Sequence, residues 1–166
     1  MKIFFSEKIN LLPFLLIFCL LLPSCTRGGA DIELIFSDFQ AEIEIRRNQE
    51  IFTANIEVSA LADRHRNARL EFISPESMSG LSVSLSDGVA ETSFGGVPLG
   101  DTPDEYLRII SLLSPVGSFE LLSRTEREIC YSSGSARWYF DAVSKLPTVI
   151  ENEQGAKIKI NSIKRK

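Results

Sequence analysis

The sequence predicts an α+β, mainly β fold: a curved antiparallel sheet or incomplete β-barrel with one apolar helix covering its concave face. Three observations support this prediction. Apolar and polar residues alternate through most segments after residue 38, as they do in strands with one buried face. Turn-forming residues separate these segments. One segment, residues 102–115, carries helix signals and is apolar nearly all round.

The first five expected strands form hairpins in chain order. Residues 38–48 and 50–62 alternate in "DFQAEIEIRRN" and "EIFTANIEVSALA", and the polar turn between them predicts an antiparallel pair. Residues 68–77 give a third strand, which is ended by its proline. Two more strands lie in "GLSVSLSDGVAETSF", residues 80–94, on either side of Asp87-Gly88, a dipeptide typical of tight hairpin turns.

The helical segment has recognisable start signals. Thr102 is expected as the N-cap, Pro103 as the first helical residue, and Glu105 as the partner that completes a capping box. A surface helix would have a polar half, so this apolar helix must be covered on most sides or face an apolar ligand. Three further strands are expected after it, in residues 119–133, 136–152 and 156–164, for a total of seven or eight.

The N-terminus predicts export and lipidation. The apolar run Leu11–Leu22 is shorter than the roughly twenty residues that cross a bilayer, so residues 1–24 are expected to be a secretory signal peptide. Leu22-Pro23-Ser24-Cys25 resembles the lipobox of bacterial lipoproteins, which implies a diacylglyceryl group on the sulfur of Cys25. Two acyl chains give stable anchoring. The alternative is an ordinary secreted protein in which Cys25 is incidental.

Composition and motifs argue against several classes of function. Without Lys2, Lys8 and Glu7, which leave with the signal peptide, the 18 basic and 22 acidic residues become 16 and 21, a net charge of −5. That balance argues against a nucleic-acid partner. The chain has one histidine, His65, and no nucleophile or metal-ligand motif, so we expect no enzyme activity, cofactor or metal. Cys130 is expected to be a small buried side chain.

Two passages resemble the lipoprotein-carrier superfamily, the LolA/LolB-like and LppX-like proteins. They are "RLEFISPESMSGLSVSLSDGVAETSFGGVPL" and "WYFDAVSKLPTVIEN…AKIKI", where Asp141, Leu146 and Pro147 match a family turn and Lys145 replaces its glycine. The resemblance implies an incompletely closed barrel with helices plugging its mouth, and an acyl chain or lipoprotein anchor as ligand. A family helix before the first strand is not expected, because "ADIELIFSD" is short. The implied organisation is a signal peptide at 1–24, a lipidated tether at 25–37 and a LolA-like domain at 38–166.

Two hypotheses of function follow. The first is a non-catalytic, lipid-anchored lipoprotein on the extracytoplasmic side of the cell membrane or outer membrane, which binds a lipid or acyl chain in an apolar cavity. The second is a structural or adaptor lipoprotein with a filled core that binds another envelope protein. An open apolar cavity of a few hundred Å³ would separate the two. The expected lining residues are Phe72, Leu81, Val83, Phe94, Ile110, Leu113, Trp138 and Phe140.

Overall fold

The computed structural model describes residues 29–47, 49–60, 66–115 and 117–166. The expected signal peptide, the lipidation site at Cys25 and His65 lie outside the described residues. No helix among the described residues is long and apolar enough to cross a membrane.

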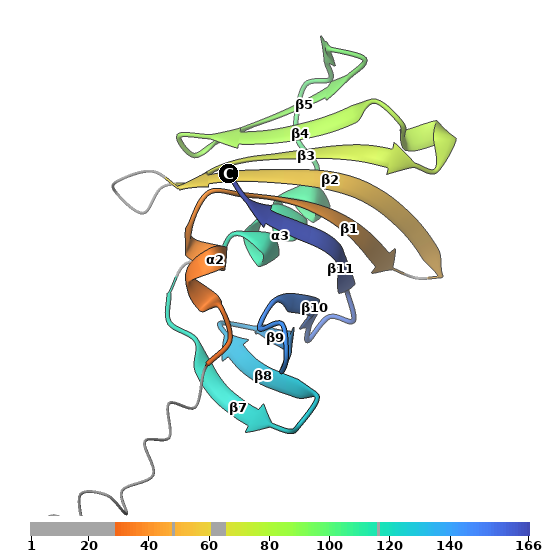
Figure 1. The fold of residues 1–166 in the computed structure, drawn as a ribbon. Helices are drawn as coiled ribbons and strands as arrows, with labels where there is room; N and C mark the ends of the chain where they lie inside the picture. The colour runs from red at the N-terminus through yellow and green to blue at the C-terminus, as the bar shows by residue number, and fades with distance from the viewer. Residues whose placement is uncertain (1–28, 48, 61–65, 116) are drawn as a thin grey trace, which may run out of the picture.

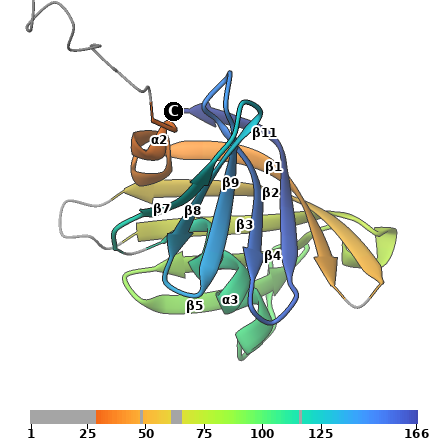
Figure 2. The same ribbon diagram turned by 90° about the horizontal axis from the view of Figure 1, so that it is seen from below.

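Eleven strands form one open antiparallel sheet in the order β6-β5-β4-β3-β2-β1-β11-β10-β9-β8-β7. Strands β1–β5 make one layer, and β7–β10 turn round beneath it, so that the sheet curls about α3 (Figures 1 and 2). The expected curved sheet with a helix on its concave face is therefore confirmed. The strands are β1 (Phe39–Arg47), β2 (Glu50–Ala60), β3 (Arg66–Ser74), β4 (Leu81–Ser86), β5 (Val89–Phe94), β6 (Val97–Pro98), β7 (Glu120–Arg124), β8 (Glu128–Ser133), β9 (Ala136–Asp141), β10 (Pro147–Asn152) and β11 (Lys157–Arg165).

Residue alternation sets the register of the predicted hairpins. In β1 and β2, Ile43 lies opposite Ala54 and Ile45 opposite Phe52, so both strands present their apolar residues to the same face. Asp87 and Gly88 both have positive φ, of 51° and 78°, as the tight turn between β4 and β5 requires. Strand β1 also pairs with β11, which brings the two ends of the domain together.

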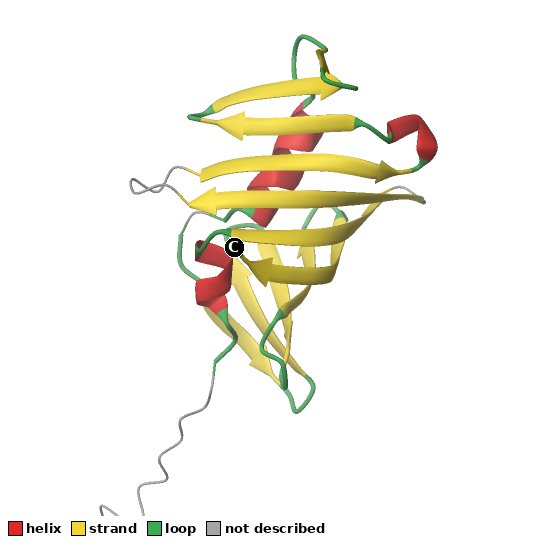
Figure 3. Cartoon of the chain, turned by 45° about the horizontal axis from the view of Figure 1, so that its top comes forward, coloured by secondary structure: helices red, strands yellow, loops and turns green. Residues whose placement is uncertain are grey.

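The helix α3 (Asp104–Leu113) begins one residue later than the capping prediction requires. Pro103 occupies the N-cap position and makes no side-chain cap hydrogen bond. The Thr102 hydroxyl oxygen instead accepts a hydrogen bond from the Thr92 hydroxyl at 2.9 Å, and Glu105 pairs with Arg47. The expected capping box is therefore wrong, because both of its side chains bind the sheet. Figure 3 shows α3 lying behind the strands of the upper layer.

The structure contains a helix that the sequence analysis did not expect. Helix α2 (Ile32–Phe36) is only five residues long, and its N-cap Asp31 accepts a hydrogen bond from the Leu34 amide at 3.1 Å. Leu34 and Ile35 are buried in the core. The judgement that this stretch is too short for a helix was therefore wrong, because burial of two large side chains stabilises it. Part of the stretch assigned to the tether, residues 29–37, thus packs against the domain.

The core is filled densely on the β7–β10 side. Phe119 lies with its ring centroid 5.5 Å from Trp138, 6.2 Å from Tyr131 and 6.5 Å from Phe140, in edge-to-face arrangements. Phe36 of α2 contacts the same ring at 5.7 Å. The residues under the β1–β3 ends are packed less completely, and the candidate site lies there.

Candidate binding pocket

A pocket of about 240 Å³ lies between α3 and the ends of β1, β2 and β3. Most of its lining is apolar, and charged groups occur at the end of β1, at the start of β2 and in the first turn of α3. The lining residues are Ile45, Arg47, Glu50, Phe52, Phe72, Met78, Glu105, Tyr106 and Ile109. An apolar floor with a few polar groups at the opening is the usual form of a site for an amphiphilic or apolar ligand.

Strand register and helix spacing bring the floor together. Ile45 and Phe52 are direct cross-strand neighbours, and both point to the concave face. The Phe72 ring lies 6.3 Å from Phe52 and 5.4 Å from Tyr106, so the three rings form a continuous wall. Tyr106 and Ile109 are three residues apart on α3 and therefore share a helix face. Met78, a flexible side chain, comes from the short helix η1 (Glu76–Met78).

One ion pair connects the helix to the sheet across the opening. Arg47, at the end of β1, pairs with Glu105 in the first turn of α3. Both side chains are partly exposed, so their attraction is screened by solvent and holds α3 only weakly. Burial raises the pKa of Tyr106, and the nearby charge of Glu105 raises it further, so the phenol stays neutral near pH 7. The wall of the pocket is thus uncharged, and the charges stay at its rim.

The pocket continues outward into a second hollow of about 510 Å³. The two share Glu50, Phe52, Met78, Glu105 and Tyr106, and the outer hollow adds Ile51, Pro75 and Ser77. Ile51 is 53 % exposed there. The site therefore widens from an apolar inner pocket to an outer hollow that combines apolar and acidic side chains.

Seven of the eight expected lining residues are buried, but only one reaches the pocket. Phe72 lines it, whereas Phe94 is 45 % exposed near the β6 edge of the sheet. The remaining six are packed in the core: Leu81, Val83, Ile110, Leu113, Trp138 and Phe140. Five apolar or aromatic residues line the pocket although they were not expected there: Ile45, Phe52, Met78, Tyr106 and Ile109. Alternation places Ile45 and Phe52 on the correct face, but nothing in the sequence marks the depth at which α3 crosses them.

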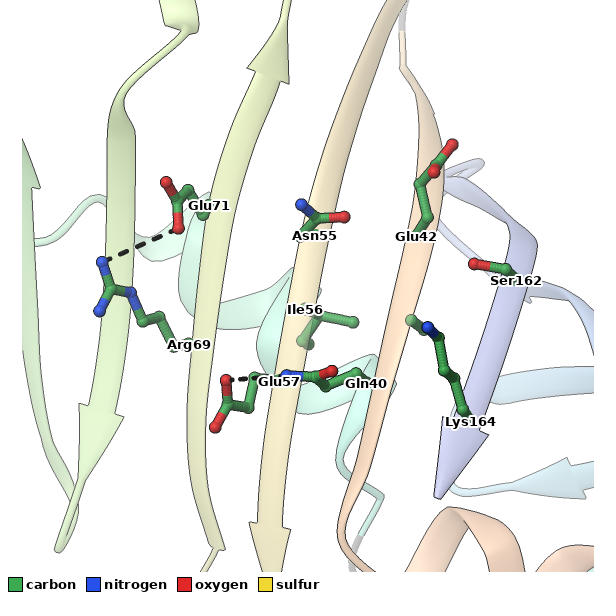
Figure 4. Close-up of a pocket in the computed structure, with 10 residues that line it drawn as sticks. Gln40, Glu42, Asn55, Ile56, Glu57, Arg69, Glu71, Ser162 and Lys164 are labelled. Atoms are coloured by element: carbon green, nitrogen blue, oxygen red, sulfur yellow. Dashed lines mark hydrogen bonds and ion pairs between the residues drawn. The ribbon is translucent and has the colours of Figure 1, made fainter. Parts of the chain in front are cut away.

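A separate, polar groove of about 460 Å³ lies on the outer face of the sheet (Figure 4). Gln40 donates to Glu57 at 3.3 Å, and Arg69 pairs with Glu71 at 3.8 Å. Hydrogen bonds from Lys166 and Gln40 hold the pKa of Glu57 below its usual range. The groove is lined by Gln40, Ala41, Glu42, Asn55, Ile56, Glu57, Arg69, Glu71, Ser162 and Lys164. This is a solvated sheet surface of mixed charge.

Two observations concern metal binding and thiol reactivity among the described residues. No group of three or more His, Cys, Asp or Glu side chains among them could hold a metal ion. Cys130 is buried on β8, and burial raises the pKa of its thiol, which lowers its reactivity. The arrangement can therefore bind an apolar group and present charge beside it.

Comparisons with known proteins find structural similarity at low sequence identity. No protein-family model and no curated protein sequence matches the chain. A solved structure of MucB is 17 % identical, with a TM-score of 0.48, and covers 81 % of this chain; this chain spans 57 % of that one. The structure of the Pseudomonas aeruginosa MucA/MucB complex is 17 % identical, with a TM-score of 0.44, over 80 % of this chain and 53 % of that one. A LolA superfamily protein from Nitrosomonas europaea is 8 % identical, with a TM-score of 0.41 over 84 % of this chain and 94 % of that one. The superfamily that the sequence passages resemble is therefore also found among the similar structures.

Proposed function

We propose that the chain is a membrane-anchored cell-envelope lipoprotein, non-catalytic, that binds an acyl chain in the pocket beneath α3. The observation that carries the proposal is the apolar pocket itself, walled by Phe52, Phe72 and Tyr106 and open at a charged rim. An acyl chain would occupy the floor, and its polar end would lie beside Arg47 and Glu105. The pocket volume of about 240 Å³ suits the end of one acyl chain and not a whole lipid, because sites for drug-sized ligands hold about 300–1,000 Å³.

Native mass spectrometry tests the ligand. Residues 26–166 are purified without detergent, and the protein mass is compared with the mass expected from the sequence. An additional mass that extracts as lipid supports the proposal and identifies the ligand class. A bare protein mass that persists after incubation with a lipid extract contradicts it.

A fluorescent fatty acid, dansylaminoundecanoate, tests the site. We expect saturable binding by residues 26–166 and weaker binding by Ile109→Phe, whose larger side chain takes up part of the pocket. The control is Leu121→Phe on the exposed strand β7, where the same aromatic group meets solvent. Equal binding by both variants would place the probe elsewhere on the protein.

The anchoring is tested through Cys25. Full-length protein expressed in a bacterial host should incorporate labelled palmitate and remain with the membrane fraction, and Cys25→Ser should lose both properties. A Cys25→Ser protein that stays membrane-bound would show that another feature holds it there.

One observation favours the adaptor hypothesis as a second candidate. Six of the expected lining residues, together with Phe119 and Tyr131, fill the interior where a larger carrier cavity would lie. A filled core is compatible with a protein whose partner binds at the surface. A native mass spectrum that shows a bound protein and no bound lipid would support this candidate.

A further inference from the structure

The outer hollow differs from the inner pocket in its charge. Its walls are apolar at Ile51, Phe52 and Tyr106, and the charged residues among its described lining are Glu50 and Glu105. Glu76 and Asp104 are exposed and lie one residue from lining positions. Among the described residues that line the two spaces, the one cation is Arg47, which lines the inner pocket and is paired with Glu105.

Three of the carboxylates in or beside the hollow are not paired with a cation. Among the described residues, Glu50, Glu76 and Asp104 have no ion-pair partner. Several carboxylates on the sheet's outer face do have one, such as Glu151 with Lys157 at 2.7 Å. An exposed apolar surface rimmed by unpaired negative charge fits a partner that is itself apolar and positively charged.

The hollow also lies far from the tether. Residue 29 precedes α2 at the Phe39 end of β1, where Arg165 pairs with Asp31 at 3.2 Å, whereas the hollow lies beyond the Arg47 end. In Figure 1, α2 lies on the left near the start of β1, and the arrowhead of β1 lies on the right. Nine residues of strand separate these ends by about 26 Å. The four peptide steps from Cys25 to residue 29 span at most about 14 Å.

We infer that the outer hollow is a docking site for a basic, apolar polypeptide segment of a protein partner, which approaches from the side facing away from the anchoring membrane. Apolar side chains of the segment contact Ile51, Phe52 and Met78, and its lysine or arginine residues lie beside Glu50, Glu76 and Asp104. The negative rim disfavours an anionic bilayer surface by the same electrostatics. The inference about direction rests on the proposed anchoring through Cys25, whereas the inference about chemistry does not.

Two model peptides test the chemistry. Fluorescein-labelled Lys-Lys-Leu-Phe-Leu-Lys-Lys and Glu-Glu-Leu-Phe-Leu-Glu-Glu share an apolar centre and differ in charge. Anisotropy titrations of residues 26–166 at about 20 mM and about 150 mM salt should give binding of the basic peptide alone, weaker at higher salt. Equal binding of both peptides, or tighter binding of the acidic one, would overturn the inference.

Matched charge variants locate the site. A triple variant should bind the basic peptide about tenfold more weakly, since each exposed charge contact contributes modestly to the affinity. Its substitutions are Glu50→Gln, Glu76→Gln and Asp104→Asn. The control combines Glu91→Gln, Glu120→Gln and Glu126→Gln, three exposed carboxylates elsewhere that remove the same net charge. Equal weakening by both sets would mean that overall charge, and not this hollow, attracts the peptide.

Dansylaminoundecanoate binding separates this inference from the proposed function. The double variant Glu76→Gln and Asp104→Asn should bind the fatty-acid probe as the parent protein does, because neither residue lines the inner pocket. Probe binding without any peptide binding would leave the proposed function and overturn the docking site. Peptide binding without probe binding would support the docking site and contradict the proposed function.

The direction of approach is tested on an anchored protein. Residues 25–166 are coupled through Cys25 to a maleimide lipid in phosphatidylcholine vesicles, since the only other cysteine, Cys130, is buried. The affinity for the basic peptide should stay within about twofold of that of the free protein. A loss of binding on the vesicle would show that the bilayer covers the hollow.

Discussion

Two neighbouring residues of α3 offer a sharp test of where the domain has free space. Ile109 lines the pocket, whereas Ile110 is fully buried in the core. Replacing each in turn with phenylalanine adds the same three carbon atoms one position apart on one helix. Helix propensity changes equally at both positions, so any difference in stability reports the surroundings of the two side chains.

The expected magnitudes follow from the space that each side chain meets. The pocket holds about 240 Å³, several times the roughly 30 Å³ that one water occupies, so the Ile109→Phe ring fits with a change in unfolding free energy within about 0.5 kcal/mol. Ile110→Phe overpacks a filled core and should cost about 1–3 kcal/mol. For a chain of this size that cost lowers Tm by roughly 3–12 °C.

Urea unfolding of residues 26–166, followed by circular dichroism, measures both variants against the parent protein. The unfolding slope m should be the same for all three, so that the midpoints report stability alone. Equal destabilisation by Ile109→Phe and Ile110→Phe would refute the reasoning, because it would mean that no side chain can enter the space beneath α3. Equal tolerance would instead indicate a loosely packed core.

Three further outcomes are expected. Ile35→Ala should cost about 2–5 kcal/mol in urea unfolding if α2 belongs to the domain, whereas Glu33→Ala on its exposed side should cost under about 0.5; equal small effects would make α2 dispensable. Lys145→Gly should stabilise the protein by about 0.5–1 kcal/mol, because Lys145 has a φ of 65°; a loss of stability would show that its hydrogen bond to the Ala142 carbonyl matters more. Cys130 in residues 26–166 should react with maleimide at pH 7 more than tenfold slower than in urea, since burial both shields the thiol and raises its pKa; equal rates would contradict its burial.

Most of the turns that were located correctly from the sequence contain glycine. Asp87-Gly88 divides β4 from β5 as expected, because positive φ at both residues leaves few alternatives. The turn between β7 and β8 was missed, and residues 119–133 were taken as one strand. In that turn the Thr125 hydroxyl accepts hydrogen bonds from the amides of Glu128 at 3.0 Å and Arg127 at 3.3 Å. Turns stabilised by a side-chain oxygen leave a much weaker mark on the sequence than glycine does.

In the turn between β9 and β10, Lys145 has a left-handed backbone conformation although it is not glycine. Asp141 accepts hydrogen bonds from the amides of Ser144 at 2.6 Å and Val143 at 3.1 Å, which lowers the pKa of its carboxyl. Lys145 then adopts the left-handed conformation that the glycine of the resembled family turn would adopt freely. The match at Asp141, Leu146 and Pro147 therefore identified the turn, although alternation alone did not.

The position of the pocket explains how a filled core and a free apolar space occur in one molecule. Alternation identifies which side chains face inward, and the interior under β7–β10 is filled by the rings of Phe119, Trp138 and Phe140. The C-terminal half of α3 completes that packing through Ile110 and Leu113, whereas its first turns, at Tyr106 and Ile109, are only half buried. The free space therefore lies where the helix begins and the strands end, and this is also where charged residues gather. A filled core and a small apolar pocket with an acidic entrance are thus consequences of one packing arrangement, and a ligand could enter the pocket without disturbing the core.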